Sequence, residues 1–337
     1  MYICSMSLSN EHIITLQNVR GIGIGSINKV CMEVERAGLS GLANSDLYEF
    51  LRELIANKTL TRVSLPDFED FKTANSAARR IISVSESKGI HVVSRFEPNF
   101  PKMLLDTVDE SGKPSVPVLL YYKGDLSITE RPALAVIGTR EPTDAGYTAG
   151  RYYAEAFATI GINIVSGLAA GCDTSGHRGA LDAGGVTTSF LAHGLDTVYP
   201  KENEGLAREI VEKGGLLLSE YPIGTGVNRY NLVARDRLQA GLANATLVVQ
   251  TGVRGGTMHA VRATLQSGKP LMAVTYKEDQ GEKEEGNRML ISQGAIGLRT
   301  RKEEIMANPD RYISMILGKP LSSAEEDDSD TFKDTLF

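Results

Sequence analysis

The sequence predicts an α/β protein in which a doubly wound, mainly parallel sheet follows a small all-α domain. Three observations lead to this fold class. Between residues 133 and 274, short apolar stretches rich in β-formers alternate with helical ones, as in sheets covered by helices on both faces. The tight loops of such a sheet favour glycine, and 21 of the 34 glycines fall between Gly138 and Gly268. Residues 8 to about 90 instead space their apolar side chains by three and four residues, as helices do.

The elements of the predicted sheet follow one another in regular order. Strands are expected at 133–137, 162–165, 187–191, 216–218, 247–249 and 271–274. Helices are expected at 145–160, 174–183, 204–212, 235–243 and 256–266. Doubly wound sheets bind ligands outside the carboxyl ends of their strands, so the residues just after each strand are the candidates for a binding site.

The chain is expected to contain four segments. They are an N-terminal helical domain (1–90), an extended proline-containing linker with the first strand of the core (91–130), the sheet domain (131–300), and a C-terminal helix with an acidic disordered tail (301–337). In the first segment Gly21, Gly23 and Gly25 resemble the turn of a helix-hairpin-helix motif, whose amides can hold a phosphate. A plain turn between two helices is the simpler interpretation.

The charge balance excludes a uniformly basic nucleic-acid binder, because 42 acidic residues face 36 basic ones and the net charge is −6. Most of this charge lies between Glu325 and Phe337, so the remaining chain is nearly neutral and can hold a local basic site. Cys4, Cys31 and Cys172 are too few and too far apart for a disulfide framework, and the scattered histidines predict no metal site. Without a membrane-spanning run or a signal peptide, we expect a cytoplasmic protein with no membrane contact.

Features suited to phosphate follow the first two strands of the predicted sheet. After the first come Gly138, Thr139 and Arg140, where glycine lets a ligand approach the backbone and arginine offers a bidentate fork. After the second strand, small residues again let a ligand approach the backbone, and a histidine lies in the first turns of the next helix. The residues predicted to bind there are Ser166, Gly167, Ala169, Gly171 and His177. A satisfied interior histidine is an equally good interpretation of His177.

The later strand ends add further cations. Lys201 is the base that follows the third strand, in an otherwise acidic stretch. Three arginines and two tyrosines lie within 17 residues after the fourth strand and can supply phosphate forks and stacking faces for bases; the arginines are Arg229, Arg235 and Arg237. After the fifth strand, Arg254, Gly255, Gly256 and Thr257 precede a helix, a pattern typical of anion sites. These basic and glycine-rich segments all follow strands and so lie at one edge of the predicted sheet. Together they predict an anion-binding site more strongly than any single motif does.

No catalytic residue is predicted. The sequence lacks the motifs of zinc proteases, serine hydrolases and paired-cysteine sites, and neither a dinucleotide fingerprint nor an NTPase phosphate loop follows the first strand. These residues favour a binding protein without a cofactor over an enzyme.

Several ordered motifs resemble those of the DprA/Smf family of DNA-processing proteins. They include Ala-Val-Ile-Gly-Thr-Arg at 135–140, Ile-Val-Ser-Gly-Leu-Ala-Ala-Gly-Cys-Asp at 164–173, Gly-Leu-Asp-Thr-Val-Tyr-Pro at 194–200 and Leu-Ser-Glu-Tyr-Pro at 218–222. The resemblance covers most of residues 90 to 300. It implies a Rossmann-like domain of the SLOG superfamily, preceded by a helical domain of the SAM or helix-hairpin-helix type.

The resemblance also implies a function. Such a protein protects incoming single-stranded DNA in a basic pocket, dimerises, and loads the RecA recombinase beside single-strand binding protein in transformation and recombination. By motif, DNA binding falls on Arg140, the Ser166-Gly167 turn, Arg235 and Arg237, and no catalytic activity is implied. Where the family has Arg-Asn-Arg, this chain has Arg-Asp-Arg, so Asp236 raises the question of a weaker contact with phosphate.

Two other functions stay open. The SLOG superfamily, which this domain resembles, also includes nucleotide-ligand sensors and phosphoribohydrolases, and Glu220 is the obvious acid for sugar chemistry. The acidic end of the chain, with its terminal Leu336-Phe337, resembles in outline the tip by which single-strand binding proteins recruit partners. That resemblance would make the chain an adaptor for repair proteins, whereas a solvating tail is the plainer interpretation.

Overall fold

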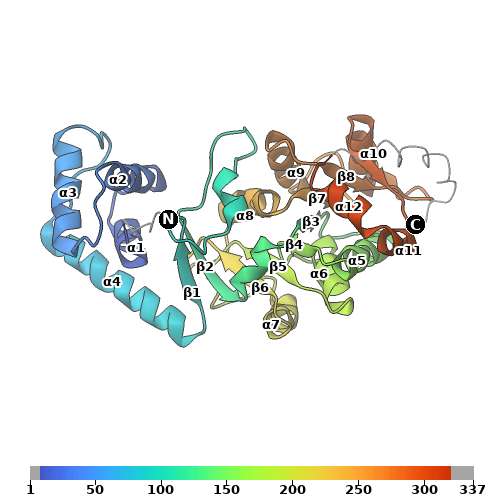
Figure 1. Ribbon diagram of the computed structural model, residues 1–337, viewed down its shortest axis with the longest axis horizontal. Helices are drawn as coiled ribbons and strands as arrows, with labels where there is room; N and C mark the ends of the chain where they lie inside the picture. The colour runs from blue at the N-terminus through green and yellow to red at the C-terminus, as the bar shows by residue number, and fades with distance from the viewer. Residues whose placement is uncertain (1–7, 320–337) are drawn as a thin grey trace. The chain divides into compact units, whose positions relative to one another are not determined.

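The computed structural model describes residues 8–319, which divide into two compact units. The first unit comprises the described residues up to Phe100 together with Val118–Tyr121, and the second comprises Pro101–Pro117 and the described residues from Tyr122 onwards. Figure 1 follows the chain through both units. The acidic stretch on which the adaptor alternative depends, residues 325–337, lies outside the described residues.

Helices make up most of the first unit, as the apolar spacing predicts. They are α1 Asn10–Asn18, α2 Ile24–Arg36, α3 Asn44–Ala56 and α4 Phe68–Ser87, and the strand β1 His91–Ser94 follows them. Ser9 Oγ accepts a hydrogen bond from His12 N at 3.2 Å and so satisfies a free amide at the start of α1. Glu11 Oε1 accepts from Asn75 Nδ2 at 2.8 Å and from Arg79 Nε at 2.9 Å, which ties α1 to α4.

The central sheet has the predicted doubly wound topology. In the second unit the strands are hydrogen-bonded in the order β6-β5-β4-β3-β7-β8-β9, and every pairing from β6 to β9 is parallel. From β3 the chain first adds β4, β5 and β6 on one side and then β7, β8 and β9 on the other. After β1 the strands are β2 Leu119–Gly124, β3 Ala133–Ile137, β4 Asn163–Ser166, β5 Thr187–Leu191, β6 Leu216–Ser219, β7 Ala245–Val248, β8 Leu271–Val274 and β9 Ile296–Leu298.

Helices cover both faces of the sheet (Figure 1). They are α5 Asp144–Thr159, α6 Cys172–Asp182, α7 Glu204–Glu212, α8 Arg229–Leu242, α9 Thr257–Gln266, α10 Glu285–Ser292, α11 Lys302–Ala307 and α12 Pro309–Ile316. Alternate side chains of β3 enter different cores: Leu134 and Val136 pack with α5, α6, α11 and α12, whereas Ala135 and Ile137 pack with α9 and α10. This period of two explains why β3 is apolar throughout.

The element bounds differ from the predicted ones mainly at α8. The other predicted strands and helices of the sheet domain begin and end within two residues of the observed ones. Helix α8 begins at Arg229 rather than at residue 235, because Asn228 Oδ1 accepts from Asn231 N at 2.9 Å and caps the helix there. Strand β9 was not predicted, since of its three residues Leu298 alone is buried.

Short 3-10 helices and further small elements complete the described part of the chain. The 3-10 helices are η1 Lys102–Asp106, η2 Leu126–Glu130, η3 Lys201–Asn203 and η4 Gly281–Lys283. Two short helices, α11 and α12, lie where one C-terminal helix was expected. Within residues 8–319, none of the helices combines the length and the apolar character that crossing a lipid bilayer requires.

Candidate nucleic-acid interface

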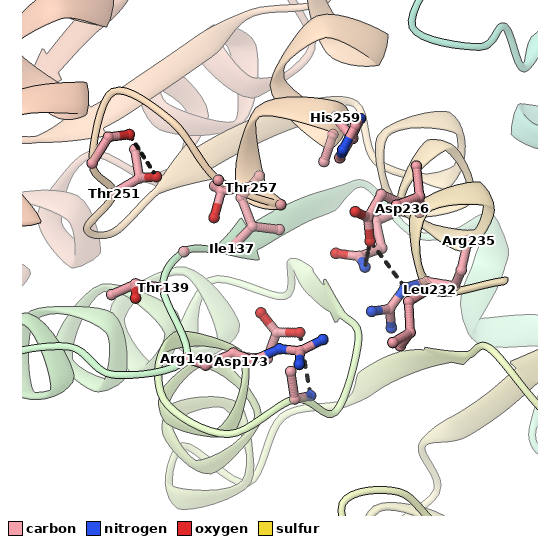
Figure 2. Close-up of a pocket in the computed structure, with 18 of the residues that line it drawn as sticks. Ile137, Thr139, Arg140, Asp173, Leu232, Arg235, Asp236, Thr251, Thr257 and His259 are labelled. Carbon is pink, nitrogen blue, oxygen red and sulfur yellow. Dashed lines mark hydrogen bonds and ion pairs between the residues drawn. The ribbon is translucent and has the colours of Figure 1, made fainter. Parts of the chain in front are cut away.

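A pocket of about 770 Å³ lies at the carboxyl ends of β3 and β7. These two strands are neighbours at the point where the order of the sheet reverses, which is where doubly wound folds bind their ligands. The walls of the pocket come from the loops after β3, β4 and β7, from α8 and from the start of α9 (Figure 2). The pocket thus brings together residues from several of the strand ends that the sequence singled out.

The loop after β3 is held tightly against the end of β7. Thr139 N donates a hydrogen bond to Gln250 O at 2.8 Å. A Cβ atom on Gly138 would lie 2.5 Å from Cys172 Sγ and 2.8 Å from Gln250 O, so this approach requires glycine. The next side chain, Arg140, is exposed, and residues 8–319 give its guanidinium no hydrogen bond or ion pair.

The loop after β4 is shaped by a buried carboxylate. Asp173 Oδ2 accepts hydrogen bonds from Gly167 N at 3.1 Å and from Ala169 N at 3.3 Å. Ser166 is fully buried, and its hydroxyl donates to a carbonyl of β3 at 2.7 Å. The side chain therefore stabilises the sheet and does not face the pocket. Gly171, with φ +78°, ends the loop at a point where a Cβ would meet the backbone of the β3 loop. Backbone of this loop therefore lies close to the pocket.

The start of α9 lies at the pocket without a side-chain cap. Met258 N and His259 N donate to Gly255 O and Gly256 O, so within residues 8–319 the amides of Gly256 and Thr257 are the ones left for a ligand. Gly256 occupies the N-cap position and supplies no side-chain hydrogen bond, and the first turn, which begins at Thr257, carries no acidic residue. Gly255, with φ +155°, makes the turn into the helix, and Arg254 beside it is exposed. Free amides and the positive end of the helix dipole together attract an anion. Residues 254–257 all line the pocket.

The five arginines predicted at this edge separate into two groups. Arg140, Arg229 and Arg254 line the pocket, are exposed, and find no ion-pair partner in the part of the chain that the structure describes. Arg235 and Arg237 are instead engaged by the protein itself. The first three are therefore the cations available to a ligand.

Arg235 is a structural link within the pocket wall. Its side chain is 5% exposed, and Nη1 donates to Gly167 O at 2.6 Å and to Phe190 O at 2.5 Å. A Cβ atom on Gly167 would overlap the guanidinium, so the contact depends on a glycine there. Arg235 thereby joins α8 to the loop after β4 and to β5.

Arg237, which the motif placed with Arg235, does not line this pocket but a smaller one that shares Val233 and His259 with it. Its guanidinium pairs with Glu220, and Nε donates to Ser115 Oγ at 2.8 Å. The same ion pair occupies Glu220, the acid considered for sugar chemistry, which is also absent from the lining of the pocket.

Asp236 is the acidic group of the α8 wall (Figure 2). Its side chain is 16% exposed, and Oδ1 accepts from Arg235 Nε at 3.2 Å. Burial raises the pKa of this carboxyl to about 6; the nearby Asp173 carboxylate adds to the rise, while Arg235 opposes it. At neutral pH the group is still mainly ionised, so it places a negative charge in an otherwise cationic wall.

His177 and Lys201 also lie away from the pocket lining, as Ser166, Gly171 and Arg237 do. His177 is fully buried, its Nδ1 lies 2.7 Å from Thr187 Oγ1, and burial lowers its pKa to about 3. It is therefore the neutral interior histidine that the sequence left as the alternative. Lys201 is exposed in η3 and does not line the pocket either. Its neighbours Tyr199 and Pro200, however, line a second, adjoining pocket.

The second pocket has a volume of about 270 Å³ and continues the first. The two share Arg140, Ala169, Leu232 and Arg235 in their linings. Gly167 and Tyr199 belong to the second pocket, so an exposed aromatic ring lies near one end of the combined groove. A groove that continues past a single binding position suits a chain-like ligand.

Sequence reasoning missed the α8 side chains that complete the wall. Leu232, Val233 and Gln239 line the pocket with Arg229 and Asp236, and these five lie three or four residues apart on one helix face. The signal that could have found them is Asn228, an N-cap residue seven positions before the predicted start of the helix. His259 and Thr251 also line the pocket and carried no comparable signal.

Comparison with known proteins identifies the family. The sequence pattern of the family described as DNA recombination-mediator protein A matches residues 91–309. The chain belongs to this family. The resemblance to DprA/Smf proteins and the Rossmann-like fold class predicted from the sequence are thereby confirmed.

Relatives in this family include Protein Smf of Escherichia coli, which is 35% identical over 223 residues. That alignment covers 66% of this chain and 58% of the relative, so the chain spans little more than half of the E. coli protein. DNA processing protein DprA of Streptococcus pneumoniae is 29% identical over 279 residues, which cover 82% of this chain and 96% of that protein.

Solved structures of family members share the fold. The crystal structure of S. pneumoniae DprA has a TM-score of 0.69 at 26% identity and covers 89% of this chain and 98% of that one. A structure of DNA processing protein A from Helicobacter pylori, which describes a single-stranded DNA binding mode, has a TM-score of 0.57 at 26% identity. It covers 66% of this chain and 96% of that one.

Proposed function

We propose that this protein binds single-stranded DNA in the groove formed by the two pockets, with Arg140, Arg229, Arg254 and the start of α9 holding phosphates. The observation that carries the proposal is the convergence of three unpaired arginines on an uncapped helix N-terminus within one pocket. Guanidinium forks and free amides are the groups that bind phosphate best. The single-stranded DNA binding described for the H. pylori relative supports the same ligand.

The charge distribution is consistent with a binding site for phosphate that is confined to one pocket. The chain carries a net charge of −6, so a polyanion is not drawn to the whole surface. The three exposed arginines that line the pocket provide the local attraction for phosphates. Sequence selectivity is not required of such contacts, because phosphates carry no sequence information.

The test is fluorescence anisotropy with a labelled oligo-dT strand. We expect a double variant, Arg140→Ala with Arg254→Ala, to bind at least about tenfold more weakly at moderate salt, because it removes two phosphate contacts. Arg208→Ala is the matched control, since Arg208 is an exposed arginine of α7 outside both pocket linings. Undiminished affinity of the double variant would contradict the proposed site.

The dependence of the DNA affinity on salt concentration is an independent measure of the same phosphate contacts. Three phosphate contacts to a single strand correspond to a slope of about −2 in a plot of log affinity against log salt concentration. The double variant should reduce that slope to about −0.7, whereas Arg208→Ala should leave it unchanged. A variant that lost affinity without losing slope would have lost its fold rather than its phosphate contacts.

The wider role that we propose follows from the family. The protein would act in the cytoplasm on incoming single-stranded DNA, as a homodimer, and would load a RecA-type recombinase in the presence of single-strand binding protein. Gel filtration with and without oligo-dT tests the dimer and the ligand together. Strand-exchange activity of RecA on DNA coated with single-strand binding protein tests the loading, with the double arginine variant as the negative control.

A further inference from the structure

The groove contains a carboxylate that phosphate binding does not explain. Asp236 lines the wall among arginines, and a carboxylate facing a phosphate would repel it. Oδ1 is occupied, since it accepts from Arg235 Nε at 3.2 Å and from Gln239 Nε2 at 3.5 Å. Residues 8–319 provide Oδ2 with no hydrogen bond. A strand of DNA in the groove would therefore place a hydrogen-bond donor, rather than a phosphate, next to this oxygen.

The carboxylate is held in a fixed position. Arg235, its partner, cannot turn away, because Nη1 is bound to Gly167 O and Phe190 O. The 16% exposure of Asp236 leaves an edge of the carboxylate at the surface of the pocket and buries the remainder. An acceptor that is fixed, partly desolvated and charged is suited to hydrogen-bond a donor on a ligand selectively.

The bases of DNA differ in what they can offer such an acceptor. Guanine presents two adjacent donors, N1–H and N2–H, on its pairing edge. Cytosine and adenine present one amino group each, and a carboxylate is a known acceptor for the cytosine amino group. Thymine presents a single N3–H between two carbonyl oxygens, which a carboxylate repels. The ranking expected at this position is guanine first and thymine last.

We propose that Asp236 selects guanine over thymine at the position of the bound strand that meets α8. This inference rests on the proposed function, because it assumes that single-stranded DNA occupies the groove. It gives the aspartate of the Arg-Asp-Arg sequence a function in binding. Arg235 positions the carboxylate of Asp236, and the carboxylate accepts hydrogen bonds from the edge of a base. Phosphate binding is then left to Arg140, Arg229 and Arg254 on the other parts of the wall.

The experiment compares labelled dT strands that differ in one central nucleotide. The centre is dT, dG or deoxyinosine, which keeps N1–H and lacks the amino group of guanine. Wild-type protein should bind the dG strand at least about fivefold more tightly than the all-dT strand, with deoxyinosine between them. This ranking tests the inference without any variant.

The variant Asp236→Asn then tests the residue. The amide has nearly the same shape and both donates and accepts, so the preference for dG over dT should fall to within about twofold. Affinity for all-dT should rise, because a negative charge is removed from a site for a polyanion. Glu212→Gln is the matched control, since Glu212 is an exposed acid of α7 outside both linings, and should keep the wild-type ranking.

The outcomes separate the two claims. Equal affinity of the wild-type protein for all three strands would overturn the role of Asp236 and leave single-stranded DNA binding intact. A dG preference that Asp236→Asn retains would also overturn it, by assigning the selection to another residue. No binding of any strand would defeat the proposed function and this inference with it.

Discussion

Arg237 and Glu220 form a two-pronged ion pair in which Nη1 meets Oε2 and Nη2 meets Oε1, both at 2.8 Å. The side chains are 13% and 19% exposed, so the pair is largely shielded from solvent. Bidentate geometry of this kind fixes both partners. The second arginine of the Arg-Asp-Arg sequence therefore stabilises the fold. Its other bonds, from Nε to Ser115 and from Nη1 to Ala234 O, leave fewer donors than the two that a phosphate fork requires.

Arg237→Ala should lower the free energy of unfolding by about 2 kcal/mol, because it leaves Glu220 largely buried without its partner. Urea denaturation measures the loss. The double variant Arg237→Met with Glu220→Gln should recover part of it, since no unpaired charge remains. If Arg237→Ala weakened DNA binding at unchanged stability, Arg237 would belong to the ligand site after all.

Gly167→Ala should damage both stability and DNA binding. The added methyl group would overlap the Arg235 guanidinium and displace it from its carbonyl partners. We expect a loss of about 2 kcal/mol in the free energy of unfolding and a weaker affinity for oligo-dT. Gly205→Ala, in α7, is the control, because a Cβ there meets nothing within 4 Å. That substitution should be neutral or stabilising by up to about 1 kcal/mol; a similar cost for both variants would disprove the steric explanation.

Acid should unfold the protein partly through His177. Burial lowers its pKa from 6.5 to about 3, so between these pH values the unfolded chain binds the extra proton. Stability from this group is complete above pH 6.5 and falls as the pH drops, by up to about 1.4 kcal/mol per pH unit. Asp236 acts in the opposite direction: its pKa rises from 3.8 to about 6, so between these values the native state binds the extra proton.

The variant Asp236→Asn isolates the second effect. Without the compensating carboxyl, stability should fall more steeply between pH 6 and pH 4 than in the wild-type protein. Urea midpoints measured across this range at constant salt provide the comparison. Parallel curves for the two proteins would show that Asp236 has the same pKa in the folded and unfolded states.

Lys269 should stabilise the end of α8. Its Nζ donates to the carbonyl oxygens of Ala240, Gly241 and Ala243 at 2.8, 2.7 and 2.8 Å. Lys269→Met leaves these acceptors short of a donor, and we expect a cost of about 2 kcal/mol and faster hydrogen exchange of the last amides of α8. Lys277→Met, at an exposed lysine, is the control. Unchanged exchange in Lys269→Met would show that water replaces the ammonium group at no cost.

The sequence predicted the sheet well because its signals are local. Apolar strands such as Ala133–Ile137 and the glycines beside them are recognisable from neighbouring residues alone. The strand-end rule then led to Arg140 and Arg254, and both line the pocket. Strand β9 could not be found in this way, since it pairs through its backbone and buries one side chain.

The assignment of individual side chains was harder because it depends on distant partners. Arg235 and Arg237 are two positions apart on a helix, and such residues point in different directions, so neighbouring letters of one motif need not share a role. Sequence spacing could not show that Arg235 finds a carbonyl oxygen on β5 or that Arg237 finds Glu220. Burial of His177 likewise depends on packing that no local pattern reveals.

The reversal of strand order at β3 has a consequence for how binding and folding are coupled. The loops after β3 and β7 are neighbours in space, but β4, β5 and β6 lie between the two strands along the chain. Arg140 and Arg254 therefore face the same ligand only once β7 has paired with β3, and chains without this long-range pairing lack the binding surface. A strand of DNA that binds the native state alone would raise the melting temperature by an amount that grows with the logarithm of its concentration above Kd, so a thermal shift on adding oligo-dT would report ligand binding and correct assembly of the sheet in one measurement.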